Sequence, residues 1–119
     1  MRVGIFADVH GNLPALQAVI ADGLKWRVDR WMCLGDLAFR GPAPAECIAL
    51  VSEMDNAMSL MGNTEEWLPS GPPVGEGDTP ARRAAIQRWW EWTIRLLPAE
   101  AVQWVERLPQ RLLLEHGRV

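Results

Sequence analysis

The segment VGIFADVHGN, residues 3–12, decides the fold of this chain. Its apolar run, Val3 to Ala7, has the continuous pattern of a strand that is buried on both faces of a parallel sheet. The run stops at Asp8-Val9-His10, and Asn12 is a residue type that often precedes the first turn of a helix. Apolar residues then recur at helical spacing from Leu13 to Leu24. The segment therefore predicts a strand, a polar turn and a helix in direct succession.

The same order recurs downstream. An apolar run that begins at Trp31 ends at Gly35-Asp36, and a Pro-rich segment, residues 42–44, opens a second helix. A weaker run that begins at Ala57 ends at Gly62-Asn63. Alternating strands and helices imply right-handed crossovers and a parallel sheet. We therefore expect an α/β fold that begins with a parallel βαβαβ unit.

The rest of the chain is predicted to hold two helices and a further strand. Residues 69–79 are rich in Pro and Gly and are expected to form a loop. Thr79 and Pro80 then start a helix, a shorter helix follows Pro98, and Leu112 to Leu114 is predicted to form a strand. The first of these helices is expected to place one face inward, made of Ile86, Trp89, Trp90, Ile94 and Leu97.

Composition and charge exclude several classes of protein. The net charge of −3 disfavours an extended nucleic-acid surface, which needs many cationic side chains. No apolar run approaches the roughly 20 residues of a membrane span, and the N-terminus does not resemble a secretory signal. Cys33 and Cys47 lie in apolar surroundings and are interpreted as buried free thiols. These features predict a cytoplasmic protein without a membrane partner.

Each predicted strand is followed by polar residues, and in a parallel sheet these residues meet at one edge. Asp8 and His10 alternate in an extended segment, so both side chains can face one cation. Asp36 has two carboxylate oxygens and could bridge two cations, and Asn63 offers an amide oxygen. Each residue alone has another interpretation, because such residues are also common in turns and caps. Their conjunction predicts a metal site.

Three blocks of the sequence resemble a known family. DVHGN at 8–12, GDLAFRGP at 35–42 and MGNTEEW at 61–67 are similar to the first three motifs of the calcineurin-like metallophosphoesterases. The resemblance is closest to the small bacterial branch of phosphodiesterases and diadenosine-tetraphosphatase-like proteins, and it extends over essentially the whole chain. It implies the N-terminal part of a metallophosphoesterase αββα sandwich. Residues 1–119 would then be a single domain that is incomplete at its C-terminus.

The resemblance also implies a chemistry. Asp8 and His10 would bind a first divalent cation, Asp36 would bridge two cations and Asn63 would bind the second. Manganese is the expected metal, with iron, zinc, nickel or cobalt as alternatives. A metal-activated water would hydrolyse a small phosphorylated substrate, such as a nucleotide-like phosphodiester.

Many relatives have a histidine where this chain has Thr64. A hydroxyl can donate a hydrogen bond but is no useful acid near neutral pH. Asn63 and Thr64 are the predicted catalytic residues.

The family completes its cluster with a His-Gly block and a Gly-His-x-His block, and the sequence departs from the family here. His116-Gly117 is interpreted as a strand-end or tail feature, because in similar sequences this stretch precedes the ligand-bearing strand. The alternative function is therefore an inactive module that acts in binding or self-association, as a homo-oligomer. A nucleotide-binding α/β domain is disfavoured, because no Gly-x-Gly-x-x-Gly follows the first strand.

Overall fold

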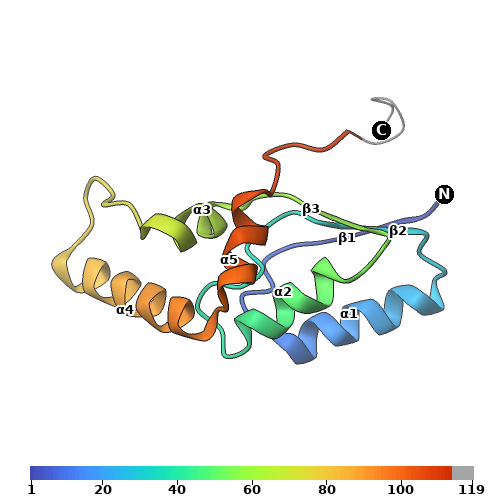
Figure 1. Ribbon diagram of the computed structural model, residues 1–119, viewed down its shortest axis with the longest axis horizontal. Helices are drawn as coiled ribbons and strands as arrows, with labels where there is room; N and C mark the ends of the chain where they lie inside the picture. Colours follow the sequence, from blue (N-terminus) through green and yellow to red (C-terminus); the bar gives the residue numbers. More distant parts are fainter. Residues whose placement is uncertain (114–119) are drawn as a thin grey trace.

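A computed structural model describes residues 1–113 of the chain. Three strands and five helices follow one another along these residues (Figure 1). In chain order they are β1 (Val3–Phe6), α1 (Leu13–Lys25), β2 (Arg30–Cys33), α2 (Pro44–Ser52), β3 (Ala57–Ser59), α3 (Asn63–Ser70), α4 (Pro80–Leu96) and α5 (Ala99–Glu106).

The three strands form one parallel sheet in the order β1-β2-β3. The register places Ile5 opposite Met32 and Met32 opposite Met58. Helices α1 and α2, which connect the strands, lie together on one face of this sheet (Figure 1). The prediction of an α/β fold that begins with a parallel βαβαβ unit is confirmed. As a consequence, the loops after β1, β2 and β3 leave the sheet at the same edge.

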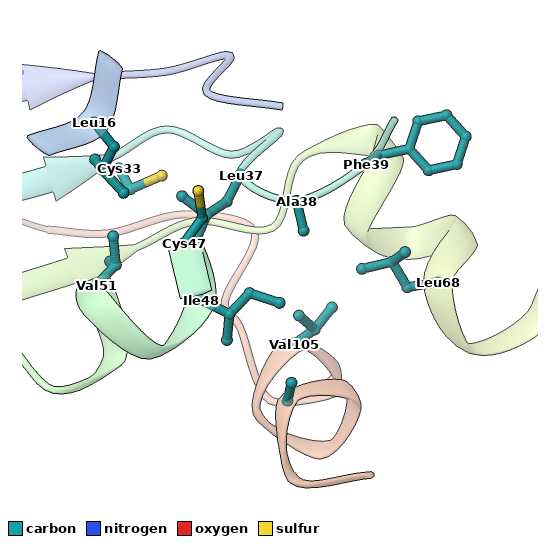
Figure 2. Packing of buried hydrophobic residues seen from close by; sticks show 11 residues of the cluster. Leu16, Cys33, Leu37, Ala38, Phe39, Cys47, Ile48, Val51, Leu68 and Val105 are labelled. Carbon is teal, nitrogen blue, oxygen red and sulfur yellow. The ribbon is translucent and has the colours of Figure 1, made fainter. Parts of the chain in front are cut away.

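The hydrophobic core is formed by residues from the first and the second half of the chain. Figure 2 shows how side chains from α1, β2, α2, α3 and α5 meet there. Burying one such aliphatic side chain contributes about 1.5–3 kcal/mol, so this cluster holds α5 against α2 and α3. Its most enclosed apolar members, each 2% exposed or less, include Leu16, Cys33, Cys47, Ile48, Val51, Leu68 and Val105.

Both cysteines belong to this core. Cys33 and Cys47 are free and buried, as the sequence predicts. Burial raises the pKa of each thiol from 9.0 to about 11, because an apolar environment disfavours the thiolate. The two thiols therefore act as small apolar side chains at neutral pH.

Helix α3 was not predicted from the sequence. Gly62-Asn63 is a favoured turn dipeptide and residues 69–79 are predicted to form a loop, yet Asn63 begins α3 and Pro69 lies within it. The Glu65 side chain accepts a hydrogen bond from the N–H of Gly62 at 3.0 Å, which is half of a capping box. This cap, followed by the acidic first turn, overrides the turn propensity of the dipeptide.

The strand predicted for Leu112 to Leu114 is not formed in the described part of the chain. Leu112 and Leu113 have no regular structure, and Leu114 lies outside the described residues. A strand needs a hydrogen-bonded neighbour, and Leu113 is 80% exposed. The segment before it does approach the sheet, since the N–H of Met61 donates to the carbonyl of Pro109 at 2.9 Å.

Helix α4 begins as predicted, because the hydroxyl of Thr79 accepts the N–H of Arg82 at 3.2 Å. The prediction for its inward face is wrong at one position. Trp89 is exposed (36%), whereas Thr93 on the same helix is fully buried. Trp89 instead lies under the guanidinium of Arg40, whose central carbon is 4.1 Å from the ring centroid. The other predicted members, Ile86, Trp90, Ile94 and Leu97, do pack against the core.

Among residues 1–113, no helix combines the length and the apolar character that crossing a bilayer requires.

Candidate metal centre

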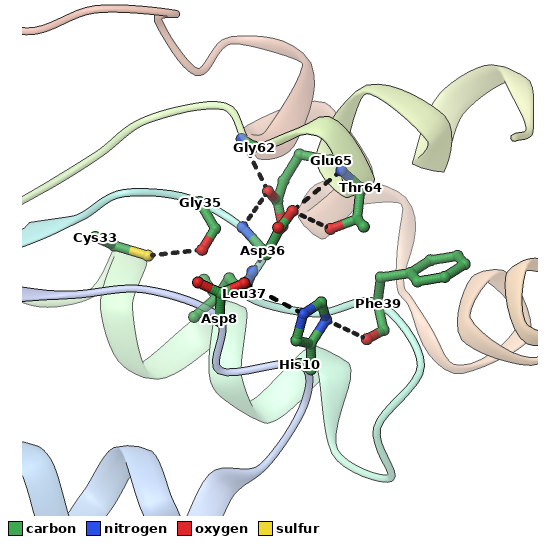
Figure 3. A network of polar contacts seen from close by, with 10 residues as sticks. All are labelled: Asp8, His10, Cys33, Gly35, Asp36, Leu37, Phe39, Gly62, Thr64 and Glu65. Carbon is green, nitrogen blue, oxygen red and sulfur yellow. Dashed lines mark hydrogen bonds and ion pairs between the residues drawn. The ribbon is translucent and has the colours of Figure 1, made fainter. Parts of the chain in front are cut away.

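The loops that follow β1 and β2 bring three predicted metal ligands together (Figure 3). Asp8, His10 and Asp36 each offer a ligand atom, and these atoms all lie within 4.8 Å of one another. The Nε2 atom of His10 is 3.6 Å from an oxygen of Asp8. These three side chains therefore lie together at the carboxyl edge of the sheet, as the sequence predicts.

Backbone hydrogen bonds between the two loops extend the parallel pairing beyond the strands. The N–H of Asp8 donates to the carbonyl of Gly35 at 3.2 Å, and the N–H of His10 donates to the carbonyl of Asp36 at 2.9 Å. Two candidate ligands from one loop are thus bonded directly to the loop that carries the third. The relative positions of the carboxylates depend on the backbone and not only on side-chain rotamers.

All three candidate ligands have a left-handed backbone conformation. The φ angles are 56° at Asp8, 48° at His10 and 55° at Asp36. Positive φ is uncommon outside glycine and costs roughly 1–2 kcal/mol per residue, although Asp and His tolerate it better than most side chains. Strain of this kind is characteristic of functional sites. No pattern in the sequence indicates it.

The ring of His10 is oriented by a backbone carbonyl. Its Nδ1 atom lies 3.0 Å from the carbonyl oxygen of Phe39, which can only accept a hydrogen bond, so Nδ1 carries the hydrogen. This leaves the lone pair of Nε2 directed toward Asp8 (Figure 3). A carbonyl or carboxylate behind the second ring nitrogen is the usual arrangement for a metal-binding histidine. Phe39 is itself fixed, since its ring packs edge-on against Trp67 with centroids 5.4 Å apart.

One oxygen of Asp36 is already bonded to α3. The hydroxyl of Thr64 donates to Oδ1 of Asp36 at 2.6 Å, and the Thr64 N–H donates to the same oxygen at 3.1 Å. Asp36 would therefore help to hold a divalent cation through the oxygen that Thr64 does not bind, Oδ2. Thr64 is 5% exposed and its hydroxyl faces Asp36. This geometry favours a positioning role for Thr64, whose predicted catalytic role stays a prediction.

Glu65 is a residue of the site that the sequence analysis missed. Its carboxylate accepts the N–H groups of Asp36 at 2.7 Å, Leu37 at 2.8 Å and Gly62 at 3.0 Å, and the residue is 1% exposed. Burial raises the pKa of Glu65, while the three backbone N–H bonds oppose this by stabilising the carboxylate. A Glu at the third position of a helix is a recognisable capping signal, and it could have identified this residue.

Asn63 begins α3 next to this network. The start of α3 lies so close to the β2 loop that a Cβ atom added at Gly62 would be 2.5 Å from the backbone nitrogen of Asp36. Only glycine fits at that contact. The side chain of Asn63 is exposed to solvent at this edge. Its assignment as a metal ligand stays a prediction.

The donor set suits a divalent cation. Two carboxylates and one imidazole combine hard oxygen ligands with a borderline nitrogen ligand, as found for manganese, iron and zinc. The side chains of Asp8 and His10 are 71% and 38% exposed, so an ion can reach them from solvent. His116-Gly117, which the sequence analysis interprets as a strand-end or tail feature, lies outside the described residues.

A family profile and several known proteins are similar to this chain. A family profile described as calcineurin-like phosphoesterase matches residues 1–118. The crystal structure of a metallophosphoesterase from Sphaerobacter thermophilus is similar with a TM-score of 0.74 and 37% identity, over 95% of this chain and 43% of that one. The hypothetical protein PH1004 from Pyrococcus horikoshii OT3 shares the fold, with a TM-score of 0.67 and 20% identity over 90% of this chain and 47% of that one.

A curated relative is similar at the level of sequence. The uncharacterized protein MJ0912 of Methanocaldococcus jannaschii is 26% identical over 115 residues, which are 97% of this chain and 44% of that protein. The chain thus spans less than half the length of these relatives. Because the family profile covers nearly every residue, the chain belongs to the calcineurin-like phosphoesterase family.

Proposed function

We propose that this chain acts in the hydrolysis of phosphate esters with two divalent cations, manganese foremost, bound by Asp8, His10, Asp36 and Asn63. The observation that supports this most strongly is the convergence of three donor side chains within 4.8 Å, each in a left-handed backbone, at the carboxyl edge of the sheet. Membership of a phosphoesterase family gives the general class of reaction. The substrate we propose is a small, nucleotide-like phosphodiester, in which a phosphate group links two organic groups.

The chain's own residues would hold and orient the ions. Bound cations would supply charge stabilisation and an activated water. His10 presents Nε2 because Phe39 binds its other nitrogen, and Asp36 presents Oδ2 because Thr64 binds Oδ1. Asn63 adds a neutral oxygen where a further negative charge is not needed. These contacts reduce the freedom of each ligand before the reaction.

The direct test is the binding of Mn²⁺ by titration calorimetry, together with hydrolysis of bis(p-nitrophenyl) phosphate. We expect Asp36→Ala to weaken Mn²⁺ binding by more than about tenfold and to reduce hydrolysis to the background rate, because in this proposal Asp36 would help to hold both ions. The matched control is Asp55→Ala. Asp55 is an exposed acid before β3, at the opposite edge of the sheet, and its removal should change neither quantity.

Unchanged Mn²⁺ binding in Asp36→Ala would contradict the assignment of Asp36 as a metal ligand. A wild-type chain that takes up no Mn²⁺ would instead favour the alternative, a module for self-association. That alternative has its own structural basis, since Ile5 and Leu34 remain 60% and 44% exposed. Large exposed apolar side chains of this kind are common at contacts between protein chains.

A further inference from the structure

The loop between β2 and α2 is bonded to α4, a helix far away in the sequence. The N–H of Arg40 donates to the hydroxyl oxygen of Thr93 at 3.1 Å, across a separation of 53 residues. Thr93 is fully buried, so water does not compete for this bond. Arg40 has a φ of 82°, a conformation that its side chain disfavours and that an external contact must hold.

The hydroxyl of Thr93 can fill this role in only one orientation. It donates its hydrogen to the carbonyl of Trp89 at 2.8 Å, which leaves a lone pair for the N–H of Arg40. The side chain of Arg40 contacts the same turn of α4, because its guanidinium lies over the ring of Trp89. Helix α4 therefore holds Arg40 by both its backbone and its side chain.

The N–H of Arg40 and the carbonyl of Phe39 belong to the same peptide group. A trans peptide is planar and its N–H and C=O point in opposite directions, so fixing one fixes the other. At one end of this peptide group the N–H of Arg40 donates to Thr93, and at the opposite end the carbonyl of Phe39 accepts from Nδ1 of His10. The orientation of the carbonyl that holds His10 is thus coupled directly to a hydroxyl on α4.

We infer that Thr93 is a positioning residue for His10, which acts through the Phe39–Arg40 peptide group and thereby sets the affinity of the metal centre. The expected effect on metal affinity rests on the proposed function, whereas the expected effect on the His10 tautomer does not. Without the hydroxyl, the strained peptide group loses its acceptor and is free to rotate, and His10 loses the carbonyl that fixes its tautomer. Loss of such an outer contact typically costs 10–100-fold in metal affinity.

The experiment compares Thr93→Val, which removes the hydroxyl at nearly constant shape, with Thr93→Ser, which retains it. The ¹⁵N chemical shifts of the imidazole report the His10 tautomer in the neutral ring without added metal, and calorimetry reports the affinity for Mn²⁺. We expect Thr93→Val to lower the affinity by about tenfold and to replace the single Nδ1–H tautomer with a mixture. Thr93→Ser should restore both. Thr93→Ala provides a second variant without the hydroxyl if the valine does not fit.

The matched control is Ile94→Val, at the next position of α4. Ile94 packs against the core, and removing one methylene group lowers stability without touching Arg40. The control should leave the tautomer and the affinity unchanged. An unchanged His10 tautomer in both Thr93→Val and Thr93→Ala would overturn the inference. A wild-type chain that binds no Mn²⁺ would refute the proposed function instead, and the tautomer would still decide the role of Thr93.

Discussion

Glu65 shows how much of the site depends on a single buried side chain. It contacts three backbone N–H groups, two in the loop that carries Asp36 and one at the start of α3. A carboxylate has enough lone pairs for all three donors. An amide in its place would have one accepting oxygen and would turn its NH₂ group toward a donor. The side chain therefore stabilises the loop only as an acid with both oxygens available.

Glu65→Gln should lower the free energy of unfolding by about 1–3 kcal/mol, because at least one buried N–H loses its acceptor. Urea denaturation followed by circular dichroism measures the change. The neighbouring substitution Glu66→Gln is the matched control, since Glu66 is exposed and contacts only the side chain of Gln110 among the described residues, at 3.2 Å. It should change stability by less than about 0.5 kcal/mol. Equal losses in the two variants would contradict the role assigned to Glu65.

At the scale of elements, the contact between the β1 and β2 loops has no room for a side chain at Gly41. A Cβ atom added there would lie 1.7 Å from the carbonyl oxygen of His10, far inside any real contact. Because the obstacle is backbone and not a flexible side chain, the two loops would have to separate. The loops carry the candidate ligands, so this spacing determines whether the ligands can meet.

Gly41→Ala is therefore expected to destabilise the chain by more than about 3 kcal/mol and to abolish Mn²⁺ binding. Thermal unfolding and calorimetry measure the two effects. Gly77→Ala is the comparison, because Gly77 has a φ of 80° but no atom within 4 Å of an added Cβ. That variant should lose only the roughly 1–2 kcal/mol of left-handed strain and should bind Mn²⁺ normally. A folded Gly41→Ala chain with normal binding would show that the loop contact is unimportant.

The sequence predicted those elements whose signals are local. The apolar runs before Asp8 and Asp36 and the Thr79 cap of α4 all correspond to real elements. The errors occur where a contact from elsewhere decides. Glu65 turns the Gly62-Asn63 dipeptide into a helix start, and Leu113 is 80% exposed, with no strand paired to it among residues 1–113.

The candidate site was predictable in its ligands but not in what holds them. Spacing after the strands indicated Asp8, His10 and Asp36, because side chains at one sheet edge must be neighbours. The contacts of Glu65 and Thr93 join positions 28 and 53 residues apart, and no local pattern reveals such pairs. The positive φ angles of the three ligands are equally invisible, since they result from how the loops pack and not from glycine.

At the scale of the whole molecule, the single core contains two thiols whose ionisation opposes folding. Cys33 and Cys47 keep their protons in the folded chain up to a pKa of about 11, whereas the unfolded chain releases them near 9.0. Between these values the folded state binds more protons than the unfolded state. The stability that the two protonated thiols contribute is fully present below pH 9 and is lost as the pH rises through 11.

The free energy of unfolding should therefore fall by about 2 kcal/mol per thiol between pH 8.5 and pH 11, as urea denaturation at each pH would show. The chain has no tyrosine and a single lysine, so it contains few other side chains of the types that ionise in this range. The double variant Cys33→Ala, Cys47→Ala should be less stable at pH 8.5 but should lose much less between the two pH values. An equally steep fall in the double variant would assign the effect to other groups.

The contact between Arg40 and Thr93 also has a consequence for the order of events during synthesis. Three of the four candidate ligands occur within the first 36 residues of the chain, yet one of the groups that fixes their loop is made 53 residues after Arg40. At about 5–20 residues per second, a ribosome needs roughly 3–11 s to travel that far. During this interval the nascent chain carries the carboxylates and the imidazole without α4 to hold the loop. The loop that contains Arg40 thus reaches its final geometry only after Thr93 has been synthesised and α4 has formed.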